Sequence, residues 1–136
     1  MRRTVLVLAA LLAVTACDPV VPPGEARVTG GIMPCGGVRT GPPHYAAGEV
    51  TVLAGNVRWV VGTQPGGPDL VDELPTKVVA RQTVSMDRTY AFDLIPGDYV
   101  LQARYLSPTE AEATPYASVT VHRGDDVRVD IPSGCF

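Results

Sequence analysis

The chain has 136 residues, enough for one small domain, with 14 acidic and 11 basic residues and a net charge of −3. Two of the basic residues, Arg2 and Arg3, precede Cys17, and no acidic residue does, so the part from Cys17 onward carries 9 − 14 = −5. An acidic domain without a basic cluster is a poor partner for nucleic acid or for anionic lipid head groups.

The N-terminus has the order of a secretory signal. A basic start is followed by the uncharged apolar run 4–13, and residues 14–17 (VTAC) place small side chains before a cysteine. The apolar run is shorter than the roughly 20 residues that a membrane-spanning helix needs. VTAC resembles the lipobox of bacterial lipoproteins. The resemblance implies that residues 1–16 are a signal peptide, removed by cleavage before Cys17, and that the thiol of Cys17 carries a diacylglyceryl group.

A diacyl anchor is sufficient for stable attachment, because two acyl chains hold a protein to a membrane where one does so only marginally. We therefore expect a lipid-anchored protein of the cell membrane that faces the extracytoplasmic side. Residues 17–25 are short and rich in proline, which favours an extended tether. Residues 26–136 are expected to form one domain.

That domain is expected to consist of short strands. Apolar and polar residues alternate in segments separated by glycine, proline and aspartate, which is typical of strands with one buried face. The predicted strands are 27–32, 49–53, 57–61, 77–86, 90–94, 99–105, 117–121 and 127–131. Two long loops, 33–48 and 62–75, interrupt the first half, and a single helical turn is conceivable at 69–74. About seven short strands without a long helix indicate an antiparallel β-sandwich.

One segment resembles a known domain family. Residues 90–103 (YAFDLIPGDYVLQA) are similar to the core of carboxypeptidase regulatory-like domains, and the strand-turn-strand at 119–131 fits their last hairpin. The pattern departs at Ile95, where the family commonly has a second proline, and at Arg88, where a turn glycine is usual. The resemblance implies an all-β, antiparallel Greek-key sandwich of about seven strands, of the prealbumin or transthyretin-like type. It implies no particular activity, because such domains serve as spacers, adhesin modules and partner-binding modules.

The cysteines favour one internal disulfide. With Cys17 carrying lipid, Cys35 and Cys135 remain as a pair, one near each end of the domain. Exported proteins fold where disulfides persist, so we expect a Cys35–Cys135 bridge. It would close a loop of about 100 residues, for which the chain-entropy model gives up to about 4.7 kcal/mol. Two free thiols are the alternative, and a metal pair fits less well because the chain has no C-x-x-C spacing.

Candidate binding residues are His44, Tyr45, Trp59, Asp69 and Asp72. Long loops on a rigid β-scaffold commonly carry binding residues. Trp59, with Tyr45, Tyr105 and Tyr116, could line a patch for peptide or sugar, although a tryptophan that fills the core is the simpler expectation.

Chemistry beyond binding has little support in the sequence. His44 is most simply a surface-loop residue, and the acidic residues Asp69, Asp72 and Glu73 lack the spacing of a calcium loop. No catalytic motif, metal site or cofactor is expected.

Three functions are compatible with these residues. The favoured hypothesis is a non-enzymatic module that binds an envelope protein or a cell-wall component. The alternative is an envelope enzyme, or an accessory subunit of one, with a loop site near His44 to which Asp69 or Asp72 would contribute. A spacer without a ligand is the third.

Overall fold

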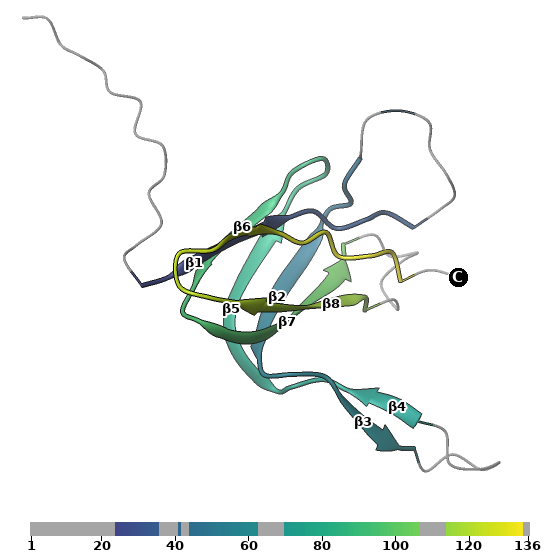
Figure 1. Cartoon of the computed structure of the whole chain (residues 1–136). Coiled ribbons are helices and arrows are strands. Elements are labelled where there is room, and N and C mark those ends of the chain that lie inside the picture. Colours follow the sequence, from purple (N-terminus) through teal and green to yellow (C-terminus); the bar gives the residue numbers. More distant parts are fainter. Residues whose placement is uncertain (1–23, 36–40, 42–43, 63–69, 107–113, 135–136) are drawn as a thin grey trace, which may run out of the picture.

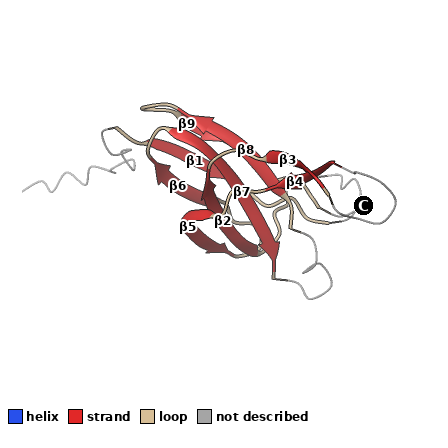
Figure 2. Ribbon diagram, turned by 90° about the horizontal axis from the view of Figure 1, so that it is seen from below, coloured by secondary structure: helices blue, strands red, loops and turns tan. Residues whose placement is uncertain are grey.

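The structure is a computed structural model, and it describes residues 24–35, 41, 44–62, 70–106 and 114–134. All regular elements within these residues are β-strands, which confirms the all-β class (Figures 1 and 2). The strands are β1 (Ala26–Gly30), β2 (Gly48–Ala54), β3 (Arg58–Val61), β4 (Leu70–Glu73), β5 (Lys77–Val84), β6 (Tyr90–Leu94), β7 (Gly97–Tyr105), β8 (Tyr116–Val121) and β9 (Asp126–Arg128).

The strands form three sheets. One sheet has three strands in the order β6-β1-β9, the second has four in the order β5-β2-β7-β8, and β3 pairs with β4 alone. The two larger sheets lie one above the other in Figure 1. Every strand pair is antiparallel except β1 and β9, which are parallel.

Apolar side chains from both larger sheets fill the space between them as one cluster. On β6 and β7 the alternation seen in the sequence is confirmed, because Tyr90, Phe92 and Leu94 are buried, as are Tyr99 and Leu101. Each fully buried large side chain contributes roughly 1.5–3 kcal/mol relative to an exposed one. The core therefore fixes which face of each strand points outward.

The predicted last hairpin is wrong, and the pair β1 and β9 departs from the antiparallel pairing that the other strand pairs confirm. β8 belongs to the four-stranded sheet and β9 to the three-stranded sheet, beside β1. Two backbone hydrogen bonds hold the connecting turn beside β1. The Arg27 N–H donates to the Asp125 carbonyl, and the Gly124 N–H donates to the Glu25 carbonyl. The chain thus crosses between the layers and arrives parallel to β1.

The helical turn at 69–74 is also wrong, because Leu70–Glu73 is strand β4. It pairs along its whole length with β3, from Arg58 opposite Glu73 to Val61 opposite Leu70. A single helical turn fixes several residues for one hydrogen bond, whereas this pairing joins two β-prone segments along four residues each. The paired segment, called the β3–β4 arm below, projects from the end of β2 in Figure 1.

Candidate binding surface

A row of polar side chains crosses the outer face of the four-stranded sheet. Each member follows or precedes a residue packed on the core, so alternation turns it outward. The strand register places these residues opposite one another, one per strand, in the order Arg81, Thr51, Gln102 and Tyr116. One step along the strands, Glu49 on β2 lies opposite Arg104 on β7.

This face is hollowed. A cavity of about 430 Å³, open to solvent, is lined by Glu49, Thr51, Arg81, Gln102 and Arg104 together with the apolar Leu53 and Val78. Among the described residues, Arg81 and Arg104 have no acidic partner, whereas Arg27, Arg58 and Arg128 each form an ion pair. The hollow therefore offers two guanidinium groups that form no ion pair with a described carboxylate, with Glu49 as the one carboxylate in its described lining.

Trp59 lies at the Tyr116 end of this row. On the β3–β4 arm it is opposite Asp72, and the Asp72 carboxylate accepts a hydrogen bond from the Tyr116 hydroxyl. That bond raises the pKa of Tyr116. The Trp59 side chain is 72% exposed, so the expectation that it fills the core is wrong. The physical reason is that the arm lies outside the two stacked sheets, where no second layer covers it.

The other predicted loop residues have local partners. His44 Nδ1 lies 3.2 Å from Asp87 Oδ1, and the same carboxylate accepts a hydrogen bond of 3.1 Å from the Tyr45 N–H. Asp87 adopts φ +58°, which aspartate tolerates better than most residues. The structure thus brings His44 to Asp87 and Asp72 to Tyr116, while Asp69 lies outside the described residues.

The expected patch of one tryptophan and three tyrosines is not formed as a whole. Tyr45 and Tyr105 are buried, and the Tyr105 hydroxyl donates to the Met33 carbonyl at 2.7 Å. Only Trp59 and Tyr116 of the four are placed to meet a ligand. The sequence reasoning missed Arg81, Gln102 and Arg104, although alternation on their strands already marked the outward positions.

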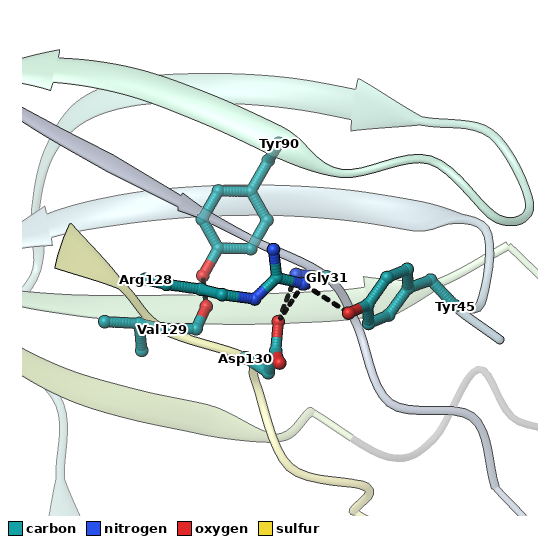
Figure 3. Close-up of polar contacts among 6 residues, drawn as sticks. All are labelled: Gly31, Tyr45, Tyr90, Arg128, Val129 and Asp130. Carbon is teal, nitrogen blue, oxygen red and sulfur yellow. Dashed lines mark hydrogen bonds and ion pairs between the residues drawn. The ribbon is translucent and has the colours of Figure 1, made fainter. Parts of the chain in front are cut away.

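A second polar cluster, shown in Figure 3, joins the end of β9 and the two residues after it to Gly31, Tyr45 and Tyr90. Arg128 donates to the Tyr45 hydroxyl, and the Gly31 N–H donates to Asp130 Oδ1 at 2.8 Å. The Tyr90 hydroxyl donates to the Val129 carbonyl, and burial, followed by the charge of Asp130, raises the pKa of Tyr90. Because these groups bond to one another, we assign them a structural role.

The base of the arm is fixed by Asp98. Its carboxylate accepts hydrogen bonds from Thr120 Oγ1 at 2.6 Å and from Asn56 Nδ2 at 2.9 Å, and Asn56 lies just before β3. These bonds, the one from Thr120 first, lower the pKa of Asp98. The charged form of Asp98 therefore holds the arm base to β8.

The arm base is expected to loosen in acid. A group whose pKa is lowered by folding stabilises the native state above its ordinary pKa, 3.8 for Asp98, and this contribution is lost as the pH falls through the lower folded-state pKa. We expect the emission of Trp59, the only tryptophan, to shift in a transition below about pH 4. Asp98→Asn should lack this transition and Asp126→Asn should keep it. An unchanged acid profile in Asp98→Asn would assign the transition to another group.

The described residues contain no group of three or more His, Cys, Asp or Glu side chains that could hold a metal ion. They also contain no helix long and apolar enough to cross a membrane. Cys17, Cys135 and residues 1–23 lie outside the described residues. Comparison of the chain with protein-family models, with curated proteins and with solved structures found no match.

Proposed function

We propose that the chain is a membrane-anchored, non-enzymatic binding module of the cell envelope. Its partner is a protein or a cell-wall component, and its binding surface is the β3–β4 arm with the adjoining hollow. The observation that carries the proposal is the exposure of Trp59 on a projecting hairpin.

An exposed tryptophan on such an arm favours recognition. Tryptophan is among the residues most enriched at binding hot spots. The neighbouring Val61 is 62% exposed, so the arm presents two large apolar side chains to solvent. An isolated two-stranded hairpin is at best marginally stable in water, and this arm is tied to the domain through the Asp72–Tyr116 and Asn56–Asp98 bonds. A ligand that covers Trp59 would stabilise the arm further.

The fold and the anchor complete the proposal. We infer a Greek-key β-sandwich of the transthyretin-like type, and the three-stranded and four-stranded sheets around one core support it. The lipobox-like segment supports removal of residues 1–16 and lipid attachment at Cys17. Residues 17–25 then tether the domain, and the described end of this tether, Gly24 and Glu25, lies beside the 122–125 turn.

A Cys35–Cys135 disulfide belongs to the same proposal. Ile32 and Ile131 form a parallel bridge, so the chain continues in the same direction from both residues. Cys35 follows Ile32 by three positions and Cys135 follows Ile131 by four, which favours their meeting. Cys35 packs against the core cluster and is not a free thiol.

The test is covalent capture of neighbouring molecules on intact cells, scored for both protein and wall-polymer adducts. We expect Trp59→Ala to lower capture by about 30-fold, the equivalent of a hot-spot loss of about 2 kcal/mol. Met86→Ala removes an equally exposed apolar side chain elsewhere and should leave capture unchanged. Cys17→Ala should abolish capture by releasing the domain from the membrane. Equal capture by wild type and Trp59→Ala would reject the arm as the binding surface.

A further inference from the structure

We propose that the partner is a linear glycan carrying carboxylate groups, bound across the outer face of the β5-β2-β7-β8 sheet. This inference rests on the proposed binding function and names the chemical class of its ligand. The glycan would run from Trp59 and Tyr116 at one edge of the sheet to Arg81 at the other, passing Arg104.

The surface has the dimensions of an extended chain. The row from Tyr116 on β8 to Arg81 on β5 spans three interstrand spacings of about 4.8 Å each, or about 14 Å. The hollow is lined by residues of β5, β2 and β7 and by Thr114 just before β8, and it is open to solvent rather than enclosed. An extended chain can therefore lie across it, which a closed pocket would not allow.

The charges of the hollow select carboxylates. Guanidinium groups bind carboxylates through two parallel hydrogen bonds, and neither Arg81 nor Arg104 forms an ion pair with a described carboxylate, although Glu49 lies opposite Arg104. Glu49, which faces the same hollow between their strands, disfavours a ligand with dense negative charge. The net charge of −3 also disfavours a ligand with dense negative charge. A chain with separated carboxylates fits this pattern, whereas nucleic acid or polyphosphate does not.

The remaining side chains suit sugar rather than protein. Gln102, Thr51 and Glu49 offer donors and acceptors for hydroxyl groups along the floor. Trp59 and Tyr116 offer aromatic faces with a polar edge at the end of the row, suited to the C–H face of a sugar ring. A protein interface normally has an apolar core depleted in charge, and this floor contains only Leu53 and Val78 as large apolar groups.

The test uses the full chain and the emission of Trp59, its only tryptophan. The probe is oligohyaluronate, a linear glycan in which each carboxylate-bearing sugar alternates with an uncharged one. The controls are the same oligomer with its carboxylates methyl-esterified and an oligoglutamate peptide of equal charge. We expect oligohyaluronate alone to shift the emission saturably, and Arg81→Gln or Arg104→Gln to weaken binding at least about 10-fold, as loss of a charge-assisted hydrogen bond does. Arg88→Gln, an exposed turn arginine, should have no effect.

Each other outcome overturns the inference. Equal binding of the esterified oligomer removes the role of the carboxylates, and tighter binding of oligoglutamate assigns the surface to peptides. If Arg88→Gln weakens glycan binding as much as Arg81→Gln and Arg104→Gln do, the loss reflects only the change in net charge. If capture on cells depends on Trp59 but not on Arg81 or Arg104, the glycan is rejected as the ligand and the proposed binding function stands. Capture independent of Trp59 rejects the arm as the binding surface and overturns a glycan path that begins at Trp59.

Discussion

Gly30→Ala is expected to destabilise the domain by about 2–6 kcal/mol, a large part of the roughly 5–15 kcal/mol that holds a small domain folded. A Cβ at Gly30 would lie 1.7 Å from the Val129 carbonyl oxygen and 2.7 Å from the Tyr90 hydroxyl. These two groups are hydrogen-bonded to each other, and one of them is backbone. The added methyl group must therefore push the 128–131 segment away from β1 and break the Tyr90–Val129 bond. Equilibrium unfolding in urea measures the loss.

Gly124→Ala is the matched control for this prediction. Gly124 has φ +80°, and a Cβ there would meet nothing within 4 Å, so alanine costs only the backbone strain of about 1 kcal/mol. Comparing the two variants separates lack of space from lack of conformational freedom. If Gly30→Ala costs no more than Gly124→Ala, the close approach between β1 and the 128–131 segment is incorrect.

Local alternation explains how much of the fold the sequence predicts. Tyr90, Phe92 and Leu94 face inward because a strand turns every second side chain to the same side, and this requires no knowledge of the partner strands. The all-β class and most strand positions follow from the same property. The turn between β6 and β7 was also predicted from nearby residues alone, because Pro96 and Gly97 suit a tight turn.

Local alternation does not predict which strands pair, because pairing depends on contacts between distant parts of the chain. Val127 and Val129 alternate in the same way whether their strand runs parallel or antiparallel to its neighbour. Alternation therefore predicted a strand there, but neither its sheet nor its direction. Trp59 shows the same limit, since its strand pattern does not reveal that β3 pairs only with β4, outside the two layers.

The sequence predicted some residues of the candidate site, but not which strands bring them together. Trp59 and Asp72 were identified from the sequence. The structure places them opposite each other, and Asp72 accepts a hydrogen bond from Tyr116, 44 positions further along the chain. Arg81 and Gln102 reach the same face only because β5 and β7 flank β2. His44 was identified as a candidate as well, but its carboxylate partner is Asp87, 43 residues away and not among the candidate residues.

Loss of the proposed Cys35–Cys135 bridge is expected to cost about 2–5 kcal/mol, since it closes a loop of roughly 100 residues in the unfolded chain. In a Cys17→Ala background, Cys35→Ser and Cys135→Ser should each lower the free energy of unfolding by the same amount. The double variant should lose no more than either single variant, because each substitution already removes the whole bridge. Urea unfolding measures all three losses, and the wild-type protein should fall to the level of the variants after reduction.

The same series also distinguishes the bridge from simple packing. Cys35 contacts the core cluster, so two free thiols would give unequal and additive losses, with the larger one at Cys35. Thiol labelling of the native protein supplies an independent result, because bridged cysteines react only after reduction. Labelling of both cysteines without reductant would remove the bridge. The stability near the end of the domain would then rest on the Ile32–Ile131 pairing and on the bonds of Tyr90 and Asp130 alone.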